Sequence, residues 1–369
     1  MGKPQRGKID FSILVLTLVL VLFGCVMVYS ASYYTASIKY GNGAYYFTKQ
    51  LLGAGLGIVA IWFFANFDFR NLERLRYVIL AMTVILLGAV FLPSPIGVSL
   101  NGSSRWINIG VTTLQPAEIA KFASVIYLSY YFSRYRDRIH RFWRGTVPGL
   151  LVVGVLCVLI LLQPNFSMIM CIAIITGILM FAAGVPMKHM VMIVLVGVAA
   201  AVVAIVMEPY RVKRVFTFLD PWSDTSGDSY QLIQSFYAFG SGGLFGKGLG
   251  RSQQKLLYLP YSESDFIFSI IAEELGFVGV VALLLLYGAL IWRGVRVALT
   301  CPSRFGSLLA TGITAMIAIQ VLINLAVVTG SIPPTGQTLP FISAGTSSLL
   351  IFMSSMGVLL NISRYTVKT

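Results

Sequence analysis

The sequence predicts an all-α integral membrane protein with ten transmembrane helices, both termini in the cytoplasm, and a long extracytoplasmic loop between helices 7 and 8. Three observations lead to this fold class. Of the 369 residues, 57% are hydrophobic and only 11% are charged, whereas a soluble domain carries about 25% charged residues. Apolar runs of helical length recur along the whole chain, and basic residues gather between alternate runs.

The apolar runs define the expected spans. A helix needs about 20 predominantly apolar residues to cross a bilayer. Ten runs approach that length, at residues 11–30, 47–66, 77–94, 116–133, 147–163, 166–184, 189–207, 265–292, 306–329 and 343–361. The first run is longer than the apolar core of a signal peptide, so we expect it to be retained. The chain is therefore expected to form one membrane domain over residues 1–369.

The basic residues orient these spans. Seventeen of the 27 Lys and Arg residues fall on the side of the N-terminus, within residues 3–8, 70–76, 134–144, 188, 293–304 and 364–368. Short cytoplasmic loops are enriched in Lys and Arg, so both termini are expected in the cytoplasm. Topology thus accounts for the net charge of +14, and we expect no nucleic-acid binding.

Residues 208–264 interrupt the pattern of short connections and are expected to form a long outer loop. Loops of this length are uncommon unless they are functional or disordered. Residues 240–255 read GSGGLFGKGLGRSQQK. The glycines permit close backbone approach, and Lys247, Arg251 and Lys255 could neutralise a phosphate. A flexible linker with solvated charge explains the same stretch, so both interpretations stay open.

Two further outer segments carry polar residues. Residues 101–122, NGSSRWINIGVTTLQPAEIAKF, predict an interfacial segment anchored by Trp106 and a helix beginning at Pro116, because proline suits a first helical turn. Residues 329–350, TGSIPPTGQTLPFISAGTSSLL, contain three prolines. Irregular backbone at membrane depth persists only where protein or a water-filled cavity satisfies it. We expect this segment to line a polar cavity.

Glu118 and Lys121 are three residues apart and so share one face of the expected fourth span. A structural ion pair inside the bundle and a role in a polar cavity both remain open.

Four carboxylates lie in YSESDFIFSIIAEELGFVG, residues 261–279, at the head and flank of the eighth run. A charge at membrane depth costs about 2.5 to 3.5 kcal/mol on insertion scales. The four are Glu263, Asp265, Glu273 and Glu274. On a helix beginning at Asp265, Glu273 lies about 80° and Glu274 about 180° around the axis from Asp265, so the four carboxylates cannot form one tight cluster. We expect Glu273 or Glu274 to bond to another span. Asp265 is expected to face the outer aqueous surface, as a helix cap or as a general base beside a phosphate site.

Stretches along almost the whole chain resemble the SEDS family of bacterial cell-wall proteins, which comprises FtsW, RodA and SpoVE. They include RWINIG, LQPAEIAKF, YRVKRVFTFLDPW, SDFIFSIIAEELGFVG, PPTGQTLPFISAGTSSL and VLLNISRY. The DPW and NISRY stretches are most similar to the FtsW and SpoVE branch. The resemblance implies a peptidoglycan glycosyltransferase that polymerises lipid II into glycan strands at the outer face of the bacterial cytoplasmic membrane, in cell division or spore cortex synthesis.

The resemblance also implies roles for individual residues. Asp265, in the DFIF motif, corresponds to the family's essential aspartate, which is proposed to take a proton from the acceptor sugar's 4-hydroxyl in an inverting displacement. The leaving group is undecaprenyl diphosphate, and a divalent cation, magnesium or manganese, is a candidate cofactor. Glu273 and Glu274 are assigned to a polar network. The implied substrate-binding residues are Arg105, Gln115, Glu118, Lys121, Arg211, Arg214, Lys247, Thr338 and Ser343.

The sequence departs from the family pattern at a few positions. Asn165 stands where the family has an acidic residue, Ala344 and Thr346 stand where it has Tyr and Gly, and Tyr261 follows Pro260 in place of Glu. The resemblance implies a class B penicillin-binding protein, a transpeptidase, as partner, together with divisome or sporulation proteins. Two other functions remain open, a lipid II flippase and a scaffold that recruits the transpeptidase.

Overall fold

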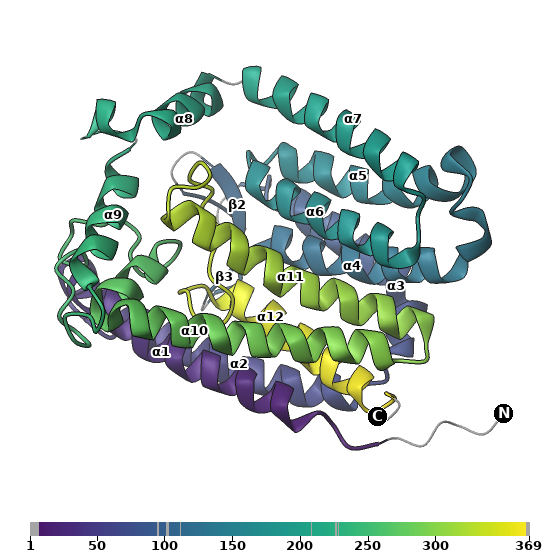
Figure 1. The fold of residues 1–369 in the computed structure, drawn as a ribbon, viewed down its shortest axis with the longest axis horizontal. Helices are drawn as coiled ribbons and strands as arrows, with labels where there is room; N and C mark the ends of the chain where they lie inside the picture. Colours follow the sequence, from purple (N-terminus) through teal and green to yellow (C-terminus); the bar gives the residue numbers. More distant parts are fainter. Residues whose placement is uncertain are drawn as a thin grey trace.

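The computed structural model describes residues 7–93, 96–100, 103–110, 112–207, 209–225, 227 and 229–366. Within these residues the chain forms twelve α-helices and one small antiparallel sheet. The long helices run side by side in a bundle, the two termini lie at one end of it, and α8 and α9 lie toward the other end (Figure 1).

Ten of the helices overlap the ten expected runs. They are α1 (Phe11–Tyr40), α2 (Tyr45–Asn66), α3 (Arg70–Ala89), α4 (Pro116–Arg134), α5 (Val147–Leu161), α6 (Phe166–Ala183), α7 (Met187–Val206), α10 (Ile267–Thr300), α11 (Arg304–Val328) and α12 (Thr346–Ser363). In the described residues, eight helical stretches are long and apolar enough to cross a membrane, and α3 and α4 are not among them. The protein is a multi-pass membrane protein.

The segment between α7 and α10 is more ordered than a loop, which corrects the expectation for residues 208–264. It contains α8 (Pro209–Leu219), the short helix η3 (Pro221–Asp224) and α9 (Tyr230–Gly242). Leu232, Ile233 and Ala238 of α9 are buried, and Phe239 packs on Phe268 of α10 with ring centroids 6.0 Å apart. Helix α9 therefore forms because it has an apolar face to bury against α10.

A three-stranded sheet corrects the all-α expectation. Strands β1 (Gly97–Leu100), β2 (Ser103–Asn108) and β3 (Thr113–Leu114) pair antiparallel in the order β1-β2-β3. Trp106 lies opposite Val98, and Ile107 lies opposite Leu114. The expected helix then begins at Pro116, as predicted. Two short helices, η1 (Arg136–Arg138) and η2 (Phe142–Thr146), connect α4 to α5.

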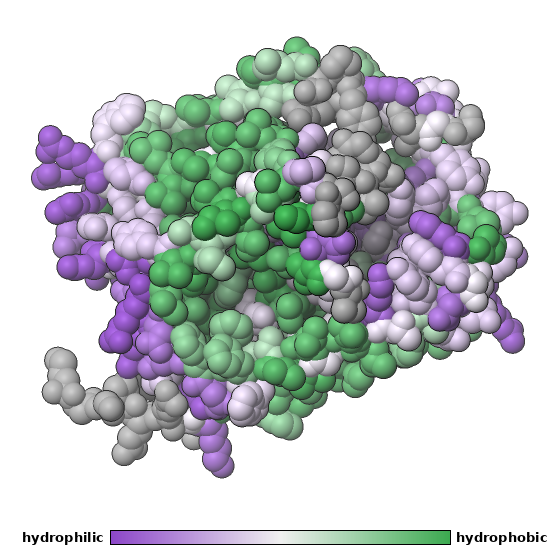
Figure 2. Space-filling view, turned by 180° about the vertical axis from the view of Figure 1, so that it is seen from behind, coloured by the Kyte–Doolittle hydropathy of each residue, from purple (hydrophilic) through white to green (hydrophobic). Residues whose placement is uncertain are grey.

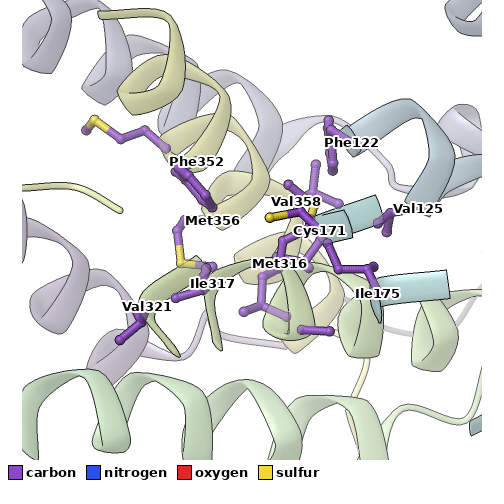
Figure 3. Close-up of a cluster of buried hydrophobic side chains, with 14 of the residues drawn as sticks. Phe122, Val125, Cys171, Ile175, Met316, Ile317, Val321, Phe352, Met356 and Val358 are labelled. Atoms are coloured by element: carbon purple, nitrogen blue, oxygen red, sulfur yellow. The ribbon is translucent and has the colours of Figure 1, made fainter. Parts of the chain in front are cut away.

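Much of the interior is apolar and closely packed. Figure 3 shows side chains from α4, α6, α11 and α12 meeting in one cluster. Glycines allow the helices to approach closely, as small residues do between membrane helices. A Cβ on Gly357 of α12 would lie 2.8 Å from the Ile61 carbonyl oxygen of α2. The face shown in Figure 2 carries a wide apolar zone with hydrophilic residues toward the two ends, as expected for a protein that spans a bilayer.

Candidate functional site

Asp265 lies just before α10 and not in its first turn. The helix begins at Ile267, with Phe266 at its N-cap, so the angles calculated from a helix beginning at Asp265 do not apply. The half-buried Asp265 side chain accepts a hydrogen bond from the Ser264 hydroxyl at 2.5 Å. Because its backbone is non-helical, tertiary contacts set where this carboxylate points.

An amide from α11 fixes the backbone at Asp265. The Asn324 Nδ2 donates to the Asp265 carbonyl at 2.8 Å and to the Gln337 carbonyl at 2.8 Å. Asn324 is fully buried. One side chain thus clamps the start of α10 to residues 331–345, the irregular stretch that we call the proline segment. Asn324 was not singled out from the sequence, although a buried amide within an apolar run is a signal for such a clamp.

Further bonds fasten the proline segment to the same place. The Ser343 hydroxyl donates to the Ser264 carbonyl at 2.6 Å and accepts from the Leu339 backbone amide at 2.7 Å. The Ala344 amide donates to the Glu263 carbonyl at 2.8 Å. Ser343 therefore positions the chain around Asp265 through its hydroxyl.

Glu263 is the carboxylate nearest to Asp265 in the chain, and its side chain is buried. Burial raises the pKa of the Glu263 carboxyl, and the negative charge of Asp265 raises it further. A hydrogen bond from Tyr46 and the charge of Lys39 act in the opposite direction. The Glu263 carboxyl thus lies within electrostatic range of Asp265, an interaction that was not predicted from the sequence.

The ion pair expected from the spacing of Glu118 and Lys121 is present. The Lys121 Nζ lies 2.7 Å from the Glu118 Oε2, and both side chains are buried. Lys121 also donates to the Gln320 side chain of α11. The Gln320 Nε2 in turn donates to the Thr338 carbonyl at 3.0 Å and to its hydroxyl oxygen at 3.2 Å. This chain of contacts connects the ion pair to the proline segment.

Arg105 approaches from the sheet. Its Nε donates to the Gln163 carbonyl at 3.1 Å, and its Nη2 donates to the Pro164 carbonyl. The following turn reaches the proline segment, because the Ser167 hydroxyl donates to the Thr335 carbonyl at 2.7 Å. The contacts described so far join the proline segment to the start of α10, to the α4 and α11 network, and to the start of α6.

Gln115 lies at the N-cap of α4 and is held through its backbone. Its amide donates to the Ser347 hydroxyl at 3.2 Å, and that hydroxyl donates to the Thr113 carbonyl at 2.6 Å. Two positions that depart from the family pattern keep local structural roles. Asn165 caps α6 by accepting from the Met168 amide at 3.4 Å, and Thr346 is the first residue of α12.

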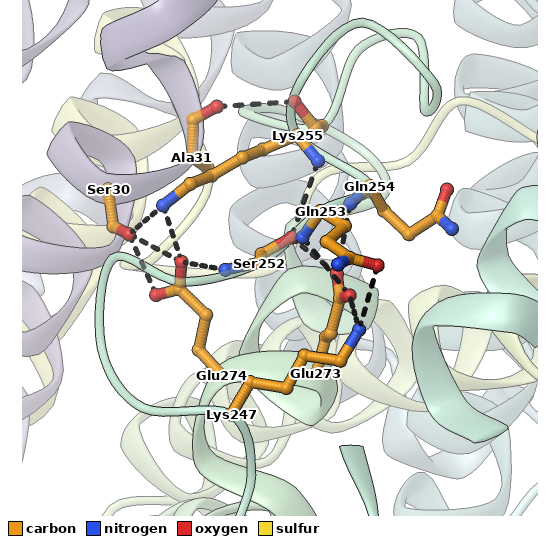
Figure 4. Close-up of polar contacts among 10 residues, drawn as sticks. Ser30, Ala31, Lys247, Ser252, Gln253, Gln254, Lys255, Glu273 and Glu274 are labelled. Carbon is orange, nitrogen blue, oxygen red and sulfur yellow. Dashed lines mark hydrogen bonds and ion pairs between the residues drawn. The ribbon is translucent and has the colours of Figure 1, made fainter. Parts of the chain in front are cut away.

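Glu273 and Glu274 form two ion pairs that join α10 to other elements (Figure 4). The Glu274 carboxylate accepts from the Ser30 hydroxyl of α1 at 2.7 and 2.8 Å and from the Lys255 Nζ at 2.7 Å. The Glu273 carboxylate accepts from the Lys247 Nζ at 2.7 Å and from the backbone amides of residues 253 and 254. Both carboxylates thus stabilise the packing of α10 against α1 and residues 247–255.

Helix α10 is interrupted at Gly276, whose φ of 66° and ψ of −167° are non-helical. Residues 243–255, the glycine loop, insert against this break and replace the two missing helical bonds. Four backbone hydrogen bonds of 2.9 to 3.1 Å join loop and helix: Lys247 to Glu273, Gly248 to Glu274, Phe277 to Gly243, and Val278 to Leu244. The expected continuous span is therefore two helical pieces stitched together by the loop.

The contacts of the glycine loop give its lysines a structural role. The charge of Lys247 is shared with Glu273, and the charge of Lys255 with Glu274, so both lysines stabilise the fold. Arg211 and Arg214 lie in α8, and their side chains fall outside the part of the chain that the structure describes. Arg105 and Lys121 are the cations that the contacts above connect to the proline segment.

This arrangement combines a half-buried carboxylate on a clamped backbone with cations on neighbouring elements. A carboxylate can take a proton from a hydroxyl group, and fixed cations stabilise negative charge that develops on a leaving group. Among the described residues, no three His, Cys, Asp or Glu side chains gather where they could hold a metal ion.

Comparison with known proteins shows what this chain is similar to. It is 42% identical to stage V sporulation protein E of Bacillus subtilis over 361 residues, 98% of each chain. It is 40% identical to the probable peptidoglycan glycosyltransferase FtsW of Trichlorobacter lovleyi over 364 residues, 98% of this chain and 95% of that one.

Two solved structures have the same fold. A chain from the study "Structural coordination of polymerization and crosslinking by a peptidoglycan synthase complex" superposes with a TM-score of 0.78 at 29% identity, covering 96% of this chain and 98% of that chain. The rod shape determining protein RodA of Thermus thermophilus superposes with a TM-score of 0.70 at 28% identity, covering 98% of each. The family model of FtsW, RodA and SpoVE, described as "Cell cycle protein", matches residues 11–368. The chain therefore belongs to the FtsW, RodA and SpoVE family.

Proposed function

We propose that this protein is a peptidoglycan glycosyltransferase that polymerises lipid II into glycan strands, in cell division or in spore cortex synthesis. The observation that carries the proposal is Asp265, whose backbone is clamped by Asn324 and whose side chain is half-buried. Similarity to SpoVE and FtsW relatives over 98% of the chain supports the same activity.

The proposed topology has ten spans in one membrane domain over residues 1–369. Helices α3 and α4 join the eight apolar stretches as spans, and their charged residues lie mainly near the ends or in the Glu118–Lys121 pair. Both termini lie in the cytoplasm, as the distribution of Lys and Arg favours. Asp265 and residues 208–264 then face outward, where the lipid-linked sugar would be polymerised.

In the proposed reaction, the Asp265 carboxylate accepts the proton of the acceptor sugar's 4-hydroxyl. The hydroxyl oxygen forms a bond to the donor's anomeric carbon as the bond from that carbon to the diphosphate oxygen breaks. Undecaprenyl diphosphate leaves with the electron pair and needs no proton from an acid. We propose direct displacement with inversion because Asp265 acts alone: the neighbouring Glu263 side chain is buried, whereas retaining glycosidases use two carboxyl groups that flank the scissile bond.

Arg105 and Lys121 are the proposed partners of the diphosphate, with Arg211 and Arg214 as further candidates. Lys121 and Lys247 are each paired with a carboxylate, Glu118 and Glu273 respectively. Lys121 is the better candidate because Gln320 connects it to the proline segment, whereas Lys247 lies in the glycine loop. Gln115, Glu118, Thr338 and Ser343 are proposed to line the substrate site, through contacts with the proline segment or α4. Magnesium or manganese remains a proposed counter-ion of the diphosphate. Magnesium is usually held by substrate phosphates and water with one or two carboxylates, so no larger protein cage is needed.

We further propose that the protein works with a class B penicillin-binding protein and with divisome or sporulation proteins. The supporting observation is the fold shared with a chain of a peptidoglycan synthase complex that couples polymerisation to crosslinking. In this proposal the partner carries out the crosslinking reaction.

Polymerisation by the purified protein tests the proposal. Labelled lipid II would be supplied to wild type, to Asp265→Ala, and to Asp137→Asn as a control on an exposed carboxylate in η1, outside the site. We expect glycan strands from wild type and the control and none from Asp265→Ala. Undiminished strands from Asp265→Ala would refute the assignment. Translocation of lipid II that persists in that variant would favour the flippase function, and normal growth of cells carrying it would favour the scaffold.

A further inference from the structure

A polar pocket lies far from Asp265, at the end of the bundle that carries the termini. Its volume is about 470 Å³, within the range of small-ligand sites. It is formed where the α4–α5 connection, the end of α6 and the α10–α11 connection meet. Its lining includes Arg136, His140, Gly184, Cys301, Arg304 and Ser307.

Contacts at the α10–α11 connection fix the position of this pocket in the fold. Phe305, next to the lining residue Arg304, stacks on Phe69 with ring centroids 6.1 Å apart. Phe69 in turn packs on Tyr365 near the C-terminus, at 5.5 Å. The pocket therefore lies on the side that the proposed topology places in the cytoplasm, near the membrane boundary.

The charges around the pocket are predominantly positive. Arg136 and Arg304 line it from different elements. The positive charge of Arg70 also acts on the thiol of Cys301, which lines the pocket. Asp137 is the acidic neighbour of Arg304. Cations gathered from separate elements repel one another, so an anion between them would stabilise the pocket.

Arg304 retains unused hydrogen-bonding capacity. Its Nη2 donates to the Ala183 carbonyl at 2.8 Å, which holds the guanidinium at the wall. Its Nε is buried and makes no hydrogen bond within the described residues. A buried donor without an acceptor costs free energy, so the guanidinium is not fully satisfied by the protein. Helix α11 begins at Arg304, so its N-terminal dipole adds to the attraction for negative charge.

We propose that this pocket binds a phosphate group, carried either by the headgroup of an anionic phospholipid or by a small soluble phosphate. Guanidinium groups bind phosphate oxygens in a bidentate geometry, and Arg136 and Arg304 can supply two such groups. Basic pockets between membrane helices on the cytoplasmic side are typical sites for anionic headgroups. The pocket is separate from the Asp265 site, so the inference stands whether or not the proposed polymerase activity does.

Binding to the purified full-length protein tests the inference. Thermal unfolding in a neutral detergent would be followed during titration with phosphatidylglycerol, with phosphatidylcholine, with inorganic phosphate, and with sodium chloride at matched ionic strength. The variants are Arg136→Gln, Arg304→Gln, and Arg144→Gln as the control. Arg144 is exposed in the same connection but does not line the pocket.

We expect phosphatidylglycerol or inorganic phosphate to stabilise wild type and the Arg144→Gln control at the same concentrations. Half-saturation should require about tenfold more ligand in Arg136→Gln and Arg304→Gln, as expected for the loss of one charged hydrogen-bonding group. A response to phosphatidylglycerol alone identifies a lipid headgroup, and a response to inorganic phosphate identifies a soluble source. Equal stabilisation of all variants, or none beyond that of sodium chloride and phosphatidylcholine, overturns the inference. Arg136 is exposed, so Arg136→Gln decides the test even if Arg304→Gln fails to fold.

Discussion

Because the glycine loop inserts into the break of α10, adding one methyl group to the loop, as in Gly246→Ala, should lower the stability of the protein strongly. Gly246 has a φ of +77°, and a Cβ there would lie 2.2 Å from the Glu274 carbonyl oxygen and 2.7 Å from the Gly276 amide nitrogen. Both neighbours are backbone atoms and cannot rotate away. In Gly246→Ala the loop must therefore separate from the helix.

The magnitude follows from two contributions. An L-residue at positive φ costs about 1 to 2 kcal/mol. Separation also weakens the bonds from Lys247 to Glu273 and from Gly248 to Glu274, each worth about 0.5 to 1.5 kcal/mol. We expect Gly246→Ala to lower the free energy of unfolding by about 2 to 5 kcal/mol.

Gly250→Ala is the matched control, because Gly250 also has a positive φ, +81°, but no atom lies within 4 Å of its Cβ position. It pays only the backbone cost, so Gly246→Ala should be less stable than Gly250→Ala by about 1 to 3 kcal/mol. Equilibrium unfolding by denaturing detergent in mixed micelles measures the difference, and polymerisation of lipid II reports whether the loop still supports the site. Equal stability of the two variants would refute the stitched-helix account.

The two ion pairs and Glu263 give further predictions. Lys255→Met leaves the buried Glu274 carboxylate without its cation and should lower the free energy of unfolding by about 3 to 5 kcal/mol. Lys247→Met should lower it less, because Lys247 is 28% exposed and Glu273 keeps its backbone donors. The same unfolding assay ranks the two variants, and a larger loss in Lys247→Met would contradict this explanation. The pKa of Glu263 is raised, chiefly by burial, so the folded state binds its proton more tightly than the unfolded state does. That contribution to stability should be complete below the unfolded pKa of about 4.3 and be lost as pH rises through the folded pKa. Melting temperatures between pH 4 and 8 should show this decline in wild type but not in Glu263→Gln, and parallel curves would count against it.

Much of the bundle could be predicted because a bilayer imposes a local rule. Each spanning helix needs a long apolar run, so the ten runs overlap ten helices of the structure. The start of α4 at Pro116 and the Glu118–Lys121 pair are also local, since they depend on residues one turn apart. Such features are encoded within a single segment of the sequence.

The site depends on contacts between distant segments, which spacing alone does not reveal. The break at Gly276 is stable only because the glycine loop supplies replacement bonds, and glycine by itself does not interrupt a membrane helix. Asn324 clamps Asp265 to Gln337 across 59 and 13 residues of sequence. The small sheet consists of strands too short for a periodic pattern. These features required the three-dimensional arrangement.

The measurement that tests the central claim most directly is gel analysis of polymer made from lipid II by wild type and by Asp265→Asn, each with and without the class B transpeptidase. Asparagine keeps the shape of the side chain but cannot accept the proton as a carboxylate does. We predict strands from wild type and a loss of about 10² to 10⁴-fold in Asp265→Asn, whether or not the partner is present. Equal amounts of polymer from the two proteins would contradict the role of Asp265 as the catalytic base.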